Sequence, residues 1–268
     1  MKSIFDLENR LDINNEFKKL LQAFQEERNA VIYSTPYHSR EYGSFIDGIN
    51  NTVFLEWKYR DTFLDVFDYL NFIGIDEFFL ENRYYIDESK FLLYLEFILN
   101  MAKLACYSDK IKLMPITNAA IENIPRILEK MNYKMEELGD KIIITKRDAD
   151  VDSILNKVPE DVAEILLEYN DFRIQSNIEY KKKVLKNLDL YIEENIKISS
   201  FDNKLDDAIG TVVNKMGVNH PIKEEPYKSF NNKQLLEWYD KCFLMMIHAI
   251  RTVEVNKIKE ERKELVKK

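Results

Sequence analysis

The sequence predicts a mainly α-helical protein: a helical N-terminal region, a small helix-plus-β-hairpin unit and a C-terminal antiparallel helical bundle. Its 268 residues include only 6 Gly and 6 Pro, which suits long helices better than a many-turned β-sandwich. Hydrophobic residues make up 46% of the chain, enough for a substantial core at this length. In most segments the apolar residues recur with the helical period.

The N-terminal region, residues 1–110, contains three segments with this period. The first covers 15–30, the second begins at Thr52 and ends at Gly74, and the third covers 88–106. The intervening residues 31–51 show no clear period and are expected to be irregular. The many aromatic side chains of this region are expected in its core: Trp57, Phe78, Phe79, Tyr84, Tyr85, Phe91, Tyr94 and Phe97.

Residues 111–150 predict a helix over 117–131 and then a β-hairpin near 133–147. Two extended runs flank Gly139-Asp140, a dipeptide typical of tight hairpin turns. A winged-helix-like unit and a small α+β cap both fit this order. The scarcity of basic residues on the helix favours the cap. Residues 148–158 are expected to form a linker.

Residues 151–268 predict four helices joined by short links, and hence a bundle. The first starts after Pro159, the second and third cover about 177–197 and 203–216, and the fourth starts near Asn232. Gly217 is suited to cap the third helix, since glycine adopts the left-handed conformation without strain. We expect no sheet of four or more strands in 159–268.

Charge and motifs exclude several classes of function. The net charge of −8 argues against a dedicated duplex-DNA binder, which needs a basic face. The sequence has no G-x-G-x-x-G and no Walker A pattern, so a nucleotide fold with the usual glycine loop is not expected. The three histidines, His38, His220 and His248, form no metal-ligand pattern. No cofactor and no metal are therefore predicted.

Three further features bear on location. The two cysteines, Cys106 and Cys242, make no C-x-x-C site and are expected to be core thiols. The N-terminus has no apolar run resembling a signal peptide. The most apolar stretch, residues 91–106, is interrupted by polar residues and is shorter than the ~20 residues of a membrane span. A cytoplasmic protein without a membrane segment is expected.

The segment VVNKMGVNHPIK, residues 212–223, is the best candidate for chemistry. It closes an apolar helix and then presents Asn219 and His220 in a polar loop, with Lys215 and Lys223 nearby. A histidine near cations could act as a general acid or base in the cleavage of a phosphodiester, while the cations bind its phosphate. The alternative is a helix cap followed by a loop histidine bonded to a backbone carbonyl.

The C-terminal part resembles the HEPN-type helical domains of bacterial abortive-infection proteins, which act in phage defence. The resemblance covers roughly residues 117–255. It rests on the layout, on helices of the type EYNDFRIQSNIEYKKKVLKNL, on the short motif NKMGVNH and on the closing helix LLEWYDKCFLMMIHAIR. It implies a bundle that dimerises and cleaves RNA without a metal, with arginine and histidine facing each other across the dimer. Residues 1–110 carry no such resemblance.

The chain departs from this pattern at one position. The residue before His220 is Asn219 rather than arginine, and an amide cannot supply the permanent charge that holds a scissile phosphate. Either another cation serves, with Lys215, Lys223, Arg173 and Arg251 as substrate-binding candidates, or the domain has lost catalysis and kept binding. The competing hypothesis is a non-catalytic helical module for interaction or oligomerisation.

The last helix also suggests self-association. Leu236, Phe243 and Ile247 lie off its main apolar face, and so broad a stripe exceeds what one contact within the chain requires. We therefore expect a homodimer through the C-terminal bundle.

Overall fold

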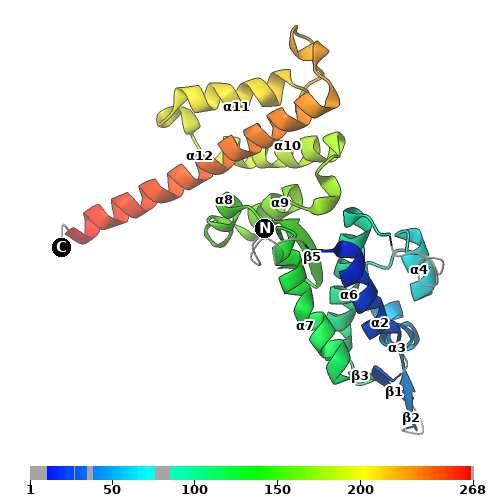
Figure 1. Cartoon of the computed structure of the whole chain (residues 1–268). Coiled ribbons are helices and arrows are strands. Elements are labelled where there is room, and N and C mark those ends of the chain that lie inside the picture. The colour runs from blue at the N-terminus through cyan, green and yellow to red at the C-terminus, as the bar shows by residue number, and fades with distance from the viewer. Residues whose placement is uncertain (1–10, 27, 35–38, 76–84, 267–268) are drawn as a thin grey trace, which may run out of the picture. The chain divides into compact units, whose positions relative to one another are not determined.

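A computed structural model describes residues 11–26, 28–34, 39–75 and 85–266, and it is mainly helical (Figure 1). The chain forms two compact units, Met1–Ile144 and Thr145–Lys268. The helix-plus-hairpin segment, expected as a unit of its own, thus lies almost wholly in the first unit. Within the described residues, no helix is both long enough and apolar enough to cross a membrane.

The first unit is built around one long helix. Its helices and strands are α2 (Ile13–Gln25), β1 (Ala30–Ser34), β2 (Ser39–Gly43), α3 (Phe45–Thr52), the 3-10 turn η1 (Phe54–Glu56), α4 (Val66–Phe72), α6 (Glu88–Tyr107), β3 (Ile111–Leu113), α7 (Pro115–Lys130), β4 (Tyr133–Leu138) and β5 (Lys141–Lys146). Helix α6 is apolar on nearly all sides, and Tyr94 on it packs edge-on against Phe17 of α2 with ring centroids 5.2 Å apart. The prediction of an aromatic core is confirmed for Trp57, Phe91, Tyr94 and Phe97, and it is wrong for Tyr85, which is 78% exposed. Phe78, Phe79 and Tyr84 lie outside the described residues.

The sequence prediction missed a second sheet in this unit. Strand β1 lies between β2 and β3 and pairs antiparallel with both. Residues 31–51, expected to be irregular, therefore hold most of a hairpin and helix α3. The signal was weak because these strands are short, and β3 is separated from β1 by most of the unit. The expected hairpin of β4 and β5 is confirmed, with Gly139 at a positive φ of 60° in its turn.

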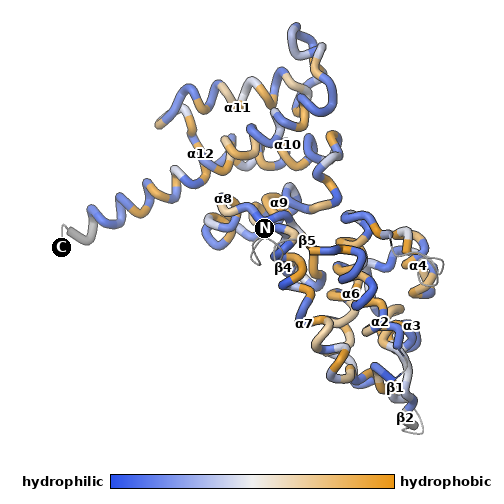
Figure 2. The backbone as a smooth tube through the Cα atoms, in the orientation of Figure 1, coloured by the Kyte–Doolittle hydropathy of each residue, from blue (hydrophilic) through white to orange (hydrophobic). Residues whose placement is uncertain are grey.

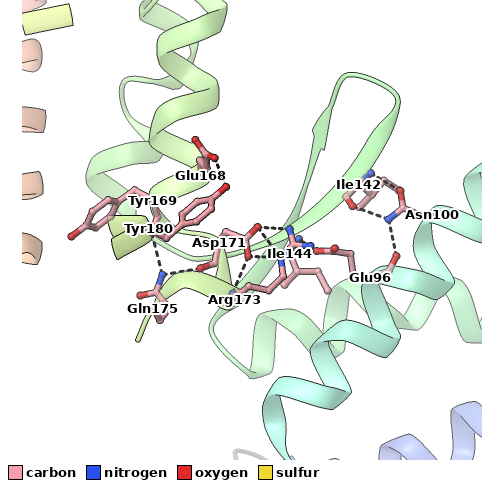
Figure 3. A network of polar contacts seen from close by, with 10 residues as sticks. All are labelled: Glu96, Asn100, Ile142, Ile144, Glu168, Tyr169, Asp171, Arg173, Gln175 and Tyr180. Atoms are coloured by element: carbon pink, nitrogen blue, oxygen red, sulfur yellow. Dashed lines mark hydrogen bonds and ion pairs between the residues drawn. The ribbon is translucent and has the colours of Figure 1, made fainter. Parts of the chain in front are cut away.

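Side chains of α6 hold this hairpin in place (Figure 3). The Asn100 amide donates to the Ile142 carbonyl at 2.8 Å and accepts from the Ile142 N–H at 2.9 Å. One turn earlier, the Glu96 carboxylate accepts from the Ile144 N–H at 2.9 Å. Helix side chains thus bond to the backbone of β5 as a neighbouring strand would.

The second unit contains the bundle. Its elements are α8 (Ala149–Asp152), η2 (Leu155–Lys157), α9 (Glu160–Tyr169), η3 (Phe172–Ile174), α10 (Ile178–Asn195), η4 (Ile198–Ser200), α11 (Asn203–Lys215), η5 (Tyr227–Ser229) and α12 (Asn232–Val266). The four predicted helices and the lack of a sheet over 159–266 are confirmed, while the expected linker contains the short helix α8. Along α10, α11 and α12, hydrophobic and hydrophilic positions alternate as in amphipathic helices (Figure 2).

Consecutive helices of the bundle run antiparallel, so α10 and α12 run parallel to each other. Helix α12 packs against both α10 and α11 (Figure 1). Its broad apolar stripe is used inside the unit: Phe243 and Ile247 are buried, and Phe243 stacks on Tyr169 with centroids 3.8 Å apart. The breadth of the stripe is therefore not evidence for a dimer, because neighbouring helices of the same chain cover it.

The two cysteines differ in environment. Cys242 is a buried core thiol on α12, as expected, and burial raises its pKa to about 12. Cys106 is exposed near the end of α6, so the prediction that it belongs to the core is wrong. It shares a helix face with Leu99 and Ala102, but it lies in the last turn of α6, beyond the buried residues of this helix.

The bond between Asn100 and β5 yields a prediction about stability. Asn100→Leu would leave a buried N–H and a buried carbonyl of Ile142 without partners, and we expect a loss of about 3 kcal/mol in the free energy of unfolding. Urea denaturation followed by circular dichroism measures this loss. The exposed Asn118 of α7 offers a control, since Asn118→Leu should change the stability little. Equal effects of the two substitutions would contradict a structural role for the Asn100 amide.

Candidate functional site

The segment after α11 turns sharply and is fixed from two sides. Gly217 has a φ of 91°, the left-handed cap conformation expected from the sequence. The backbone N–H of Asn219 donates to the Val213 carbonyl at 2.9 Å. From α12, the Tyr239 hydroxyl donates to the Met216 carbonyl at 2.8 Å. The backbone that presents Asn219 and His220 is thus held firmly.

His220 projects from this turn and is exposed. Within the described part of the chain, its side chain makes no hydrogen bond and no ion pair. The alternative that the histidine bonds a local carbonyl finds no support in this geometry. An exposed imidazole can exchange protons with a ligand, although nothing in the unit orients it. His248 is exposed on α12, and His38 lies outside the described residues.

Asn219 has a structural partner. Its amide donates to Asp189 of α10 at 3.1 Å, and the Asp189 side chain is buried. The Asn219 carbonyl oxygen is itself buried and has no hydrogen-bond partner among the described residues. The amide therefore ties the turn to α10 and points into the unit, a direction unsuited to holding a phosphate beside His220.

Asp189 sits on the apolar side of α10 next to this amide. Removal from water raises the pKa of its carboxyl group, and the nearby Glu193 adds to the rise, while the bond from Asn219 opposes it. The carboxylate has no cation as a partner in the described residues. Its ionised form is therefore less stable in the fold than in water.

The candidate cations are dispersed, and most are engaged. Lys215 pairs with Glu224 at 3.2 Å, and Arg251 pairs with Asp150 of α8 at 2.9 Å. Arg173 forms a forked pair with Asp171 (Figure 3). Lys223 is exposed and pairs with none of the described residues.

Helix geometry separates the two arginines from His220 within one chain. Arg251 lies twelve residues beyond Tyr239, which contacts the turn, and this is about 18 Å along α12. Arg173 lines a hollow at the start of α10 with Asn177 and Ile178. Asp189, the contact of Asn219, lies about 16 Å further along that helix. Of the predicted cations, only Lys215 and Lys223 are near the histidine, and they are its neighbours in the sequence.

The groove beside the turn is acidic. It lies between α10 and α11, encloses about 510 Å³, and is lined partly by Asp189, Glu193, Asp206 and Asp207. Lys215 is the basic residue at its edge. Carboxylates repel a phosphodiester backbone, so this groove is a poor channel for RNA.

A second polar cluster, which the sequence analysis missed, lies where α9, α10 and α12 meet. Lys181 is 1% exposed and pairs with Asp240 of α12 at 2.5 Å. The Tyr169 hydroxyl donates to the same carboxylate oxygen at 2.9 Å, and the Lys181 ammonium lies 4.8 Å from the Tyr169 ring centre. A signal existed: Lys181 is in helical phase with Val184 and Leu188, so the pattern places it on the apolar face.

Comparison with protein-family models, with curated proteins and with solved structures finds no match for this chain. Among the described residues, no group of three or more histidine, cysteine or acidic side chains is placed to hold a metal ion.

The buried carboxyl group of Asp189 yields a prediction about pH. Because its pKa is raised in the fold, the folded state binds more protons than the unfolded state above pH ~4, and stability falls as the pH rises through this window. Asp189→Asn removes that loss. We expect the variant to be more stable than the wild type at neutral pH, with the difference shrinking toward pH ~4.

Urea denaturation at several pH values measures the difference. Asp207→Asn, at an exposed position of α11, is the control and should show no comparable dependence on pH. A wild type that is more stable than Asp189→Asn at neutral pH would show that the ionised carboxylate is favourable after all.

Proposed function

We propose that this chain is a bacterial phage-defence protein of abortive-infection type, whose HEPN-like bundle acts as a binding module without cleaving RNA. The defence role rests on the resemblance of residues 117–255. The loss of cleavage is supported by one observation above all: the amide of Asn219 is bonded to the buried Asp189, where an active site would need a free cation.

The charges around the turn agree with this proposal. The adjoining groove is acidic, and three of the four candidate cations, Lys215, Arg173 and Arg251, have carboxylate partners inside their own unit. A phosphate would have to break these pairs to be bound. RNA therefore remains a proposed partner of the bundle, with no cleavage step assigned to His220.

An active, metal-independent endoribonuclease is the second candidate. It is favoured by the exposure of His220 and by Lys223, which has no ion pair among the described residues. In this alternative, a second copy of the chain would supply the missing cation across a dimer. His220 would then act as the general acid or base.

We also propose a homodimer, now through the distal part of α12. No residue of this helix is buried between Arg251 and Lys263, yet Val255 is 43% and Ile258 58% exposed there. Beside them lies a groove of about 560 Å³ with Ile196 and Phe201 on its wall. Acidic and basic residues are intermixed along this stretch, so two copies can approach without strong repulsion.

Substitution of His220 separates the two candidate functions. In a bacterial host, expression of the wild type should reduce phage plaques, and His220→Ala should protect equally well if the bundle only binds. The helical signal and melting temperature should be unchanged within error, because an exposed loop side chain contributes little packing. Purified wild type should leave RNA intact.

The exposed His248 provides the control, as His248→Ala. RNA cleavage by the wild type that only His220→Ala abolishes would establish the nuclease instead. An absence of protection by the wild type would refute the defence role.

The homodimer is tested at Ile258. Ile258→Glu places a charge in the proposed contact and should raise the dimer dissociation constant at least tenfold, which light scattering at micromolar concentration detects. Ile116→Glu, at an equally exposed isoleucine of α7, should leave the mass unchanged. A wild type that is monomeric under these conditions would contradict the dimer.

A further inference from the structure

A separate pocket lies beside the Lys181 cluster and shares no lining residue with the His220 turn. It encloses about 390 Å³, within the range of small-molecule sites. Its polar lining includes Asn170, Gln175 and Asp240, its apolar wall includes Phe243 and Leu244, and Lys146 and Arg147 lie at its edge. All of these residues belong to the second unit.

Asn170 is the most informative residue of this lining. It is 8% exposed, and its backbone is fully used: its N–H donates to the Leu167 carbonyl at 3.1 Å and its carbonyl accepts from the Lys146 N–H at 2.8 Å. Its side-chain amide makes no hydrogen bond with any described residue. Asn170 lines the pocket, so its amide can be reached from there, and an amide can both donate to and accept from a ligand.

The neighbouring polar groups are oriented by bonds on their other atoms. The Gln175 amide nitrogen donates to the carbonyls of Tyr169 and Asp171 at 3.2 and 3.1 Å (Figure 3), which leaves its oxygen as an acceptor. Asp240 receives Lys181 and Tyr169 on the same oxygen, Oδ1. Its Oδ2 accepts no hydrogen bond from the described residues. The pocket thus presents fixed acceptors beside the Asn170 amide.

A lysine, Lys146, lines the same pocket as these polar groups. Lys146 is exposed and has no ion pair among the described residues. The bond from its backbone N–H to the Asn170 carbonyl holds the two backbones side by side, and both residues line the pocket. A ligand that fits would therefore carry a hydrogen-bonding head with a donor and an acceptor, and an anionic group at the other end.

We propose that this pocket binds a nucleoside monophosphate whose base carries an exocyclic amine, as adenine and cytosine do. The Asn170 amide would accept from the amine and donate to the adjacent ring nitrogen, the pairing by which asparagine recognises adenine. Asp240 and Gln175 offer further acceptors for the amine, and Lys146 offers its charge to the phosphate. A free nucleotide and the terminal nucleotide of an RNA strand share this chemistry.

Calorimetric titration of the full-length protein tests the proposal. Adenosine monophosphate should bind at one site per chain. Uridine monophosphate, which lacks the amine, should bind about tenfold more weakly or worse. Adenosine should also bind more weakly, since it lacks the phosphate. Equal affinity for the two monophosphates, or no binding of adenosine monophosphate at millimolar concentration, overturns the proposal.

Two variants locate the site. Asn170→Leu should lower the affinity for adenosine monophosphate at least tenfold. Lys146→Gln, at an exposed position where folding is not at risk, should lower it for the monophosphate but not for adenosine. Lys197→Gln, an exposed lysine outside the pocket, is the charge control. If Lys146→Gln and Lys197→Gln have the same effect, the phosphate is not held at this pocket.

Titration with a short oligoadenylate that carries a terminal phosphate shows whether the natural ligand is a free nucleotide or the end of an RNA strand. Tighter binding than the mononucleotide, still lost in Asn170→Leu, indicates an RNA end, whereas tighter binding of the mononucleotide indicates a free nucleotide. Neither result depends on phage protection, so failure of this proposal and failure of the defence role are distinguishable.

Discussion

The ion pair between the buried Lys181 and the half-exposed Asp240 constrains the arrangement of the second unit. An ammonium group that is removed from water needs a strong partner, and here it has a carboxylate at 2.5 Å and the face of the Tyr169 ring. Tyr169 in turn binds the same carboxylate and stacks on Phe243. Three helices, α9, α10 and α12, are therefore linked through one charge, and each must keep its register for the lysine to remain paired.

This register has consequences along both long helices. The packing of the parallel helices α10 and α12 also brings Asp189 close to the buried Cys242, whose pKa is raised by burial and in part by that carboxylate. The same alignment places Asp189 where the turn after α11 must pass, and Asn219 binds it there. The residue that would be expected to hold phosphate is thus committed to the interior of the bundle.

The ion pair also forms the boundary of the proposed nucleotide pocket. Because Asp240 uses a single oxygen for both of its bonds to Lys181 and Tyr169, its other oxygen is left without an internal donor in the described residues. The backbone bond between Lys146 and Asn170 brings a cationic residue and an amide residue into the same lining. The pocket is thus built from residues that already stabilise the fold, which gives it a shape fixed in advance of binding.

The sequence by itself determined the long helices of the second unit, because periodic apolar residues and caps such as Gly217 and Pro159 act locally. In the first unit the helix expected from Thr52 to Gly74 is reduced to α4 and the turn η1. It also indicated the hairpin at Gly139-Asp140 and the candidate turn around His220. It did not reveal the sheet of β1, β2 and β3, whose strands are short and pair with residues distant in the chain. The partners of Asn219, Lys181 and Asn170 were decided only by tertiary structure. Hydrogen bonds and ion pairs between helices depend on how the helices pack, and no local pattern encodes that register.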